Sequence, residues 1–151
     1  MSDDITTFVP EDPTFVPAKR SQQAAVTMLR ELAPRADEIT TGVDDKVTFR
    51  DCGANFESVS CPKCRREIDL ETWQNWMSED SSDGEGFRLA SFVTPCCAGA
   101  VTLNDLVYEW PQGFSRYHLG ARNAGRRFSA ASIRKLEEVL GCRLRVIRQH
   151  I

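Results

Sequence analysis

The chain has 151 residues, 41% of them hydrophobic, and a net charge of −3. This length suits one hydrophobic core, so we expect a single α/β domain over residues 1–151. No stretch approaches the roughly 18 apolar residues of a membrane span, and the start lacks the basic and apolar regions of a signal peptide. Composition therefore argues against a membrane protein and predicts a cytoplasmic one.

The first third of the chain predicts a strand, a helix and two further strands. Phe8 and Phe15 each lie in a Thr-Phe-Val-Pro sequence, and the prolines favour extended backbone, so we expect a strand followed by a proline-rich lead-in. Ser21 can cap a helix whose apolar residues recur with helical spacing until Pro34. Two short β-rich stretches follow within residues 38–50, separated by a hairpin-like break at Gly-Val-Asp-Asp.

Residues 52–104 contain the most specific signal in the sequence. Cys61 and Cys64 flank two residues, and after 31 further residues come the adjacent Cys96 and Cys97. This is the layout of a tetrahedral zinc site that closes a loop, with iron as the alternative metal. The cysteines could instead form disulfides, but a Cys-x-x-Cys pair in a reducing compartment more often holds a metal. A site of four thiolates has no open position, which predicts a structural metal.

The second pair of cysteines is the less regular one. Side chains of adjacent residues in extended backbone point in opposite directions, so Cys96 and Cys97 can both be ligands only if the flanking proline and glycine bend the chain. Cys52 or His118 is the alternative fourth ligand, and a site completed by histidine or water would again permit catalysis. Otherwise Cys52 and Cys142 are small buried residues. We assign no catalytic residue, because the chain has no nucleophile elbow, phosphate-binding glycine loop or His-Glu-x-x-His motif.

A short helix and a loop are expected between the two pairs of cysteines. Asp69 can cap a helix whose apolar side chains, from Leu70 to Met77, lie on one side. Residues 78–86 are acidic and rich in glycine, with no large apolar side chain to offset the entropy of ordering them. We expect them to form a mobile surface loop.

The C-terminal region predicts a second strand-helix-strand unit. Residues 114–121 alternate like a strand, Ser129 or Ser132 can cap a helix that ends at Gly141, and residues 142–146 alternate as a final strand. Two such units in one chain predict an α+β fold, a ferredoxin-like βαββαβ sandwich. The zinc-binding segment would be an insertion between its halves.

Aromatic and basic side chains are interspersed after residue 107. Residues 114–151 carry 9 basic and 2 acidic side chains, whereas residues 1–113 carry 10 basic and 20 acidic ones. In a single-strand binder, the aromatic side chains of this region could stack with bases while its arginines contact phosphates. Alternatively, the acidic part of the same domain neutralises the basic charges, and the aromatic residues serve core packing and a protein contact. The candidate partner-binding residues are Tyr108, Trp110, Phe114, Arg116, Tyr117, Arg122, Arg126 and Arg127.

The motifs also support a resemblance. Cys-Pro-x-Cys, the tryptophan-bearing helix and Pro-Cys-Cys-x-Gly are followed by Leu103-Asn104-Asp105-Leu106-x-Tyr108-x-Trp110-Pro111-x-Gly113-Phe114. This combination, over residues 56–151, resembles uncharacterised bacterial proteins with a zinc-ribbon-like segment. The resemblance implies a cytoplasmic bacterial protein, and it carries over only the four cysteines as metal ligands.

Three hypotheses about function follow from these patterns. The first is a non-catalytic zinc-binding protein that acts through contact with another protein, as adaptors and toxin-neutralising immunity proteins do. The second is nucleic-acid binding by residues 114–148. The third is a zinc enzyme with an open coordination position, or a thiol enzyme that uses Cys52 or Cys142.

Overall fold

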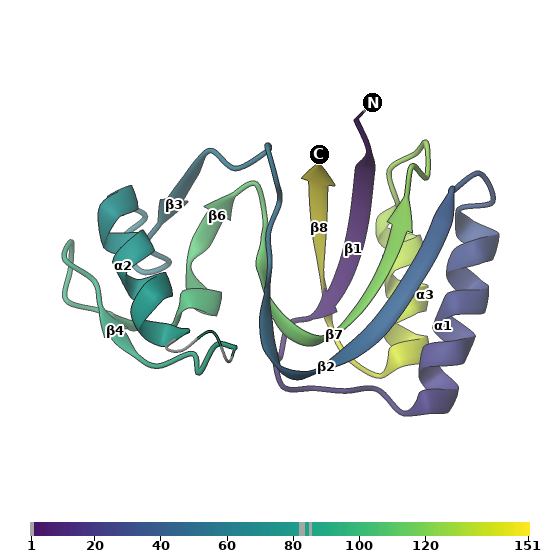
Figure 1. Cartoon of the computed structure of the whole chain (residues 1–151), viewed down its shortest axis with the longest axis horizontal. Coiled ribbons are helices and arrows are strands. Elements are labelled where there is room, and N and C mark those ends of the chain that lie inside the picture. The colour runs from purple at the N-terminus through teal and green to yellow at the C-terminus, as the bar shows by residue number, and fades with distance from the viewer. Residues whose placement is uncertain (1, 82–83, 85) are drawn as a thin grey trace.

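The computed structural model describes residues 2–81, 84 and 86–151. These residues form an α+β fold with three α-helices, a four-stranded antiparallel sheet and two small hairpins (Figure 1). In chain order the elements are β1 (Asp4–Pro10), α1 (Lys19–Leu32), β2 (Glu38–Arg50), β3 (Ser58–Ser60), α2 (Leu70–Asp80), β4 (Phe92–Val93), β5 (Ala100–Val101), the 3-10 helix η2 (Leu103–Asp105), β6 (Val107–Glu109), β7 (Gly113–Arg122), α3 (Ala130–Leu140) and β8 (Leu144–His150).

The large sheet has the strand order β2-β7-β1-β8, and every neighbouring pair is antiparallel. Helices α1 and α3 lie side by side on one face of this sheet, as Figure 1 shows. Alternation along the strands directs Phe8, Tyr117 and Leu119 toward the helices, where they join Leu29 and Leu136 in a fully buried core. Each of these side chains contributes about 1.5–3 kcal/mol through burial.

Both helices of this layer begin and end near the predicted positions. The Ser129 side chain accepts the N–H of Ser132, and Gly141 ends α3 with a φ of 77°, which confirms the predicted cap and stop. The predicted cap at Ser21 is wrong, because α1 begins at Lys19. The chain enters the helix directly from Pro17, whose carbonyl accepts a hydrogen bond from the side-chain amide of Gln22.

The hairpin predicted within residues 38–50 does not form. These residues are one strand, β2, which pairs with β7 along its length and shifts register between Val43 and Thr48. The residues predicted to turn therefore lie at an irregularity within the strand, where the pairing with β7 shifts as it does at a β-bulge. Arg50, after this shift, forms an ion pair with Asp44 within it. The final strand, β8, is also displaced from the predicted residues 142–146, because β1 continues to pair with it as far as His150.

The chain between β2 and β7 builds a second core around α2. Trp73 and Tyr108 meet edge to face there, and the Trp73 Nε1–H donates to the Tyr108 hydroxyl, which donates in turn to the Leu103 carbonyl at 2.7 Å. Phe49 and Phe114 extend this core to the large sheet, with ring centroids 5.1 Å apart. The segment between β2 and β7 is therefore packed against the four-stranded sheet.

Helix α2 confirms the predicted helix after Asp69 and extends farther than expected, to Asp80. Residues 78–80, assigned from sequence to a mobile loop, are thus helical, and positions 82, 83 and 85 of that prediction lie outside the described residues. The Asp80 carboxylate is buried and accepts the backbone N–H groups of Leu89 and Ala90 at 2.7 and 2.8 Å. Through these two hydrogen bonds, Asp80 holds residues 89 and 90 next to the C-terminal end of α2.

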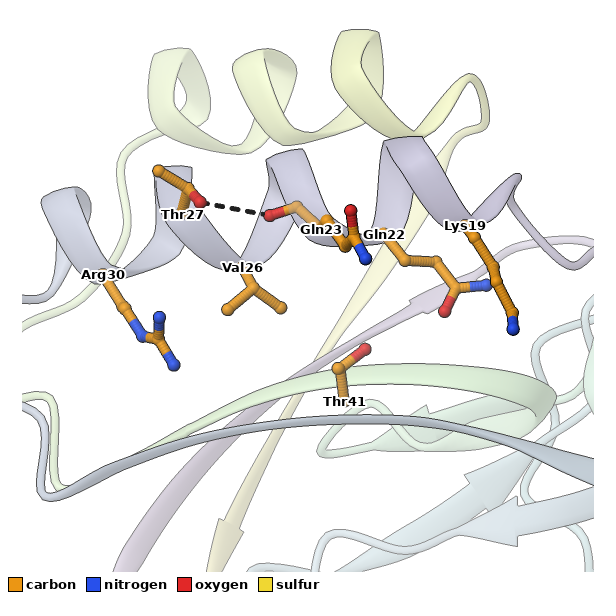
Figure 2. Close-up of a pocket in the computed structure, with 7 residues that line it drawn as sticks. All are labelled: Lys19, Gln22, Gln23, Val26, Thr27, Arg30 and Thr41. Atoms are coloured by element: carbon orange, nitrogen blue, oxygen red, sulfur yellow. Dashed lines mark hydrogen bonds between the residues drawn. The ribbon is translucent and has the colours of Figure 1, made fainter.

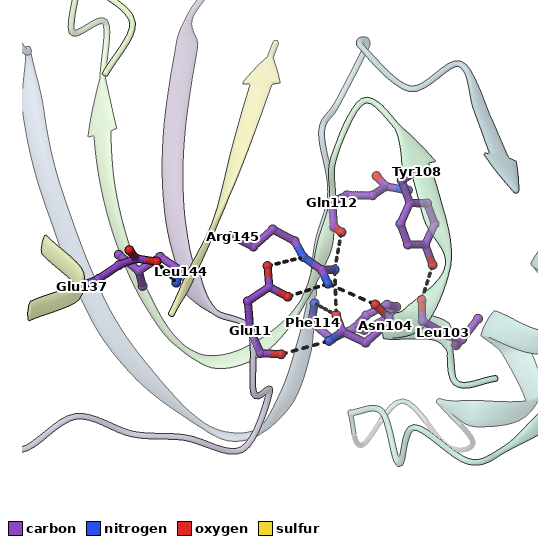
Figure 3. A network of polar contacts seen from close by, with 9 residues as sticks. All are labelled: Glu11, Leu103, Asn104, Tyr108, Gln112, Phe114, Glu137, Leu144 and Arg145. Atoms are coloured by element: carbon purple, nitrogen blue, oxygen red, sulfur yellow. Dashed lines mark hydrogen bonds and ion pairs between the residues drawn. The ribbon is translucent and has the colours of Figure 1, made fainter. Parts of the chain in front are cut away.

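Arg145 of β8 holds the inserted segment to the sandwich (Figure 3). Its guanidinium donates to the Glu11 carboxylate, to the side-chain and main-chain oxygens of Asn104, and to the Gln112 carbonyl. The Asn104 side chain donates to the Glu11 carbonyl and accepts the N–H of Phe114. One arginine thus links the end of β1, helix η2 and the start of β7.

Replacing this arginine tests the link. Arg145→Met keeps the apolar stem but removes the donor to the main-chain oxygens of Asn104 and Gln112 and to the Glu11 carboxylate, so we expect a loss of about 2–4 kcal/mol in the free energy of unfolding. The exposed Arg143 offers a matched control, and Arg143→Met should change stability by less than about 0.5 kcal/mol. Urea unfolding followed by circular dichroism measures both; equal stability of the two variants would contradict the proposed link.

Candidate metal centre

The sulfur atoms of Cys61, Cys64, Cys96 and Cys97 lie within 4.8 Å of one another. The Cys61 and Cys97 sulfurs are 3.8 Å apart, and those of Cys64 and Cys96 are 3.2 Å apart. Four sulfurs placed about 2.3 Å from a tetrahedral zinc ion would be separated by about 3.8 Å. The cluster thus has close to the dimensions of a four-thiolate metal site, and the sequence prediction that these cysteines come together is correct.

The first two cysteines lie in a tight loop between β3 and α2. The Cys61 N–H donates to the Arg66 carbonyl, and the Cys61 carbonyl accepts the Arg65 N–H, both at 2.9 Å. Arg65 has a φ of 66°, which turns the chain back after Cys64. This geometry directs the sulfurs of both cysteines to the same side of the loop.

The loop between β4 and β5 has the same backbone arrangement. The Thr94 N–H donates to the Gly99 carbonyl at 2.9 Å, the Thr94 carbonyl accepts the Ala98 N–H at 3.0 Å, and Ala98 has a φ of 55°. Both loops also carry proline at their second position. Thr94 therefore occupies the position that Cys61 occupies in the first loop, and Cys97 corresponds to Cys64.

This correspondence explains how adjacent cysteines can join one cluster. Cys96 and Cys97 are the third and fourth residues of a turn, so the opposite directions expected for extended backbone do not apply. The bend comes with the positive φ of Ala98. Gly99 leaves room for the Lys63 side chain, which a Cβ atom at residue 99 would approach to 2.6 Å.

Thr94 is a part of the site that sequence reasoning missed. It is 1% exposed, its hydroxyl lies 3.5 Å from the Cys97 sulfur, and the same oxygen accepts the Gly99 N–H at 3.0 Å. Hydrogen bonds from the Thr94 hydroxyl and the Gly99 N–H lower the pKa of Cys97. The signal available in the sequence was the repeated x-Pro-x-Cys-x-x pattern at residues 61–66 and 94–99.

The pKa values of the two cysteines in the first loop are shifted in opposite directions. Backbone N–H groups of Cys64 and Lys63 lower the pKa of Cys61 to about 6, against the effect of burial. The Arg66 N–H lowers the pKa of Cys64, but the Cys96 sulfur, burial and the other thiols outweigh it and raise that pKa to about 11. Thiols packed this closely cannot all ionise unless a cation compensates their charge, which is the chemistry of a metal site.

The alternative ligands and nucleophiles lie elsewhere. Cys52 is fully buried, and its N–H and thiol both donate to the side-chain oxygen of Gln112. Burial raises the pKa of Cys52 and raises that of Cys142 to about 11, so neither has the low pKa of a reactive thiol. Burial also lowers the pKa of His118. Within the part of the chain that the structure describes, neither Cys52 nor His118 belongs to the sulfur cluster.

The eight residues predicted to contact a partner are divided between core and surface. Tyr108, Phe114 and Tyr117 are buried, so their rings serve packing. Arg122 forms an ion pair with Asp3 at 3.7 Å. An acidic residue of the N-terminal part thus neutralises this basic residue, which is one of the two alternatives drawn from the charge distribution. Arg116 donates to the Asp44 carbonyl. The other three are Trp110, Arg126 and Arg127.

Those three residues line one hollow of about 400 Å³, together with Arg148. Arg148 lies within the region 114–148 that the nucleic-acid hypothesis covers, but it was not one of the eight named residues; it belongs to β8, which continues to His150. The hollow lies at the edge of the sheet beside β8, where Asn55 of the inserted segment donates to the Arg148 carbonyl.

A second hollow, of about 460 Å³, lies between α1 and the edge strand β2 (Figure 2). The Thr27 hydroxyl donates to the Gln23 carbonyl along the helix, and Lys19 and Arg30 mark the two ends of the hollow. Among the described residues, its lining has no cysteine, histidine or carboxylate side chain. The Lys19 amine and the hydroxyls of Thr27 and Thr41 therefore have no histidine or carboxylate base beside them in this lining. The lining residues are Lys19, Gln22, Gln23, Val26, Thr27, Arg30 and Thr41.

No protein-family model matches the chain, and comparisons with curated proteins and with solved structures return no match. The resemblance to bacterial proteins with a zinc-ribbon-like segment therefore stays a prediction. Of the helices that the structure describes, none is long and apolar enough to cross a membrane. Function has to be inferred from the geometry of this chain alone.

Proposed function

We propose that Cys61, Cys64, Cys96 and Cys97 bind one Zn²⁺ in a closed structural site, and that the protein acts without catalysis by binding another protein. The observation that carries this proposal is the approach of four sulfurs to within 4.8 Å, with no fifth ligand group in the cluster among the described residues. Four thiolates fill the tetrahedral coordination that zinc takes in structural sites. Such an ion has no position at which to polarise a substrate or activate water.

We propose further that the four long strands and two helices form a ferredoxin-like sandwich. Helix α1 connects β1 to β2, α3 connects β7 to β8, and the sheet order β2-β7-β1-β8 places the first and third long strands at its centre. This order supports the βαββαβ topology expected from the sequence. The zinc site would then stabilise an insertion in the connection between the second and third strands.

The outer face of α2 is the surface that we assign to the partner. The inner face of this helix packs into the second core, where Trp76 stacks on Phe92 with ring centroids 5.1 Å apart. Leu70, at the first position of α2, is 45% exposed, and Val93 of β4 is 65% exposed. Exposed acidic side chains lie close to Leu70 in the sequence, at Glu67, Asp69 and Glu71, and another, Glu79, lies near the C-terminal end of the helix.

An acidic surface with exposed apolar side chains suits a partner that presents a basic surface with an apolar pocket. The metal would act on this contact indirectly, by holding the hairpins that support α2. The turn from Trp110 to Phe114, which contains two of the predicted partner-binding residues, is a poorer candidate because Gln112 and Phe114 are buried. An adaptor or immunity-type protein would use such a surface.

The experiment is a pull-down from a lysate of the source organism with tagged protein. Leu70→Arg/Glu71→Lys alters the outer face of α2, and Val43→Arg/Glu38→Lys is the matched control, because Val43 on β2 is 42% exposed and Glu38 is also exposed. The proposal expects a protein recovered by the wild type and by the control but not by the α2 variant. A partner recovered equally by all three, or no partner at all, would contradict it.

A further inference from the structure

Two neighbouring hollows lie beside β8. The first, of about 400 Å³, is lined by Trp110, Arg126, Arg127 and Arg148, and also by residues of β1. The second, of about 260 Å³, is lined by Trp110, Val146, Arg148 and the proline that follows the tryptophan. Trp110 and Arg148 line both hollows, so the two meet at these side chains, and together they are called the groove.

The arginines of this groove are not neutralised by the acidic part of the domain. Ion pairs of the described residues involve Arg50, Arg122 and Arg145, whereas Arg126, Arg127 and Arg148 belong to none. The Arg126 guanidinium donates one hydrogen bond to the Leu32 carbonyl, at 3.2 Å, and its charge stays unpaired. Among the described residues, one carboxylate lies in the lining, that of Asp4, and its oxygen is 2.7 Å from Nδ1 of His150. The groove is therefore a locally positive site on a chain whose net charge is −3.

Two of these guanidinium groups repel each other. Burial, and after it the charge of Arg127, lowers the pKa of Arg148. Placing like charges in one hollow has a cost in free energy that an anion between them would remove. Guanidinium groups suit a phosphate in particular, because their planar donors match two of its oxygens.

Trp110 provides a fixed aromatic surface in the same groove. Part of its ring packs against the buried side chains of Val9, Cys52 and Ile147, while the residue also lines both hollows. An indole held in this way is a platform for stacking, and bases of any sequence can stack on it. Arginines beside a partly exposed aromatic ring are the combination with which proteins bind single strands.

We propose that this groove binds single-stranded nucleic acid, with phosphates held by Arg126, Arg127 and Arg148 and a base stacked on Trp110. A free phosphate would need only the arginines, but the groove extends on both sides of the indole, as a continuing chain requires. This activity is separate from the proposed protein contact, because none of the four residues belongs to α2 or to the sulfur cluster.

Fluorescence anisotropy with a labelled oligothymidylate of about 15 nucleotides tests this inference. Three neutralised phosphates predict an affinity loss of about 20-fold between about 50 and about 200 mM salt. Arg127→Glu/Arg148→Glu should weaken binding at least about tenfold and flatten the salt dependence to about threefold over the same range. Trp110→Leu should weaken binding about fivefold or more and leave the salt dependence unchanged, because it removes a stacking surface and no phosphate contact.

A matched control distinguishes binding in the groove from a general effect of the net charge of the protein. Lys19→Glu/Arg30→Glu makes the same change in net charge at the hollow beside α1, and it should alter affinity by less than about threefold. Circular dichroism establishes that each variant is folded. An equal loss in this control and in the groove variant would overturn the proposal, as would the absence of binding at low salt. If a folded Trp110→Leu variant binds the oligothymidylate with unchanged affinity, no base stacks on Trp110. The groove would then recognise phosphates alone, and inorganic polyphosphate would be an equally good ligand.

Discussion

Removal of the proposed zinc ion is expected to unfold the segment between β2 and β7 while the four-stranded sheet and its two helices stay folded. The hairpins of this segment, β3 with β6 and β4 with β5, have strands of only two or three residues, which are not stable alone in water. Binding of a structural zinc ion to such a site is worth about 10–16 kcal/mol at neutral pH. The sandwich has a separate hydrophobic core, so it does not depend on this contribution.

Hydrogen exchange followed by mass spectrometry measures this effect segment by segment. After treatment with a chelator, or in a Cys61→Ser variant, we expect residues 58–68 and 92–101 to lose protection, while β1, α1 and α3 keep theirs. Cys142→Ser is the matched control, since Cys142 lies outside the sulfur cluster and its replacement should leave the pattern unchanged. A chelator-treated protein with the same protection as the native one would show that the metal does not hold this segment.

Moving one cysteine ligand from position 96 to position 94 of the second loop is expected to preserve most of the zinc affinity. Cys96→Ser removes a thiolate and should lower zinc affinity by more than about 100-fold, since even the loss of a ligand's hydrogen-bond partner costs 10- to 100-fold. Thr94 occupies the position of Cys61 in the matching loop, and its hydroxyl is already 3.5 Å from the Cys97 sulfur. A double variant, Thr94→Cys/Cys96→Ser, should therefore regain most of the lost affinity.

Competition with a chromophoric chelator gives the affinities of the wild type and both variants. Thr94→Val serves as a third variant that removes the hydroxyl hydrogen bonds to Cys97 and Gly99 but leaves all four thiols in place. The zinc affinity of this variant should be about 10- to 100-fold lower than that of the wild type. If the double variant binds zinc as weakly as Cys96→Ser alone, then the two loops do not hold the metal in equivalent ways.

Features that depend on neighbouring residues could be predicted from the sequence. Ser129 and Gly141 set the ends of α3 by capping and by a positive φ, both of which are local effects. The spacing of Cys61 and Cys64 likewise specifies a loop with two sulfurs on one side. These predictions required no knowledge of the rest of the chain.

Features that depend on distant partners could not be predicted in this way. The turn-favouring residues after Thr41 remain within one strand because β7 pairs with them from about 75 positions away along the chain. The role of Arg145 depends on three segments that meet only in the folded protein. Thr94 was missed because a search for metal ligands examines cysteine and histidine, whereas its role follows from a loop shape shared with residues 61–66.

The most direct test of the closed site is X-ray absorption at the zinc edge, on protein purified without a chelator and shown to contain one metal ion per chain. We predict four sulfur atoms at about 2.3 Å and no lighter ligand in the first coordination sphere. A nitrogen or oxygen ligand at about 2.0–2.1 Å would instead show an open or histidine-completed site and would contradict the structural role proposed for the metal.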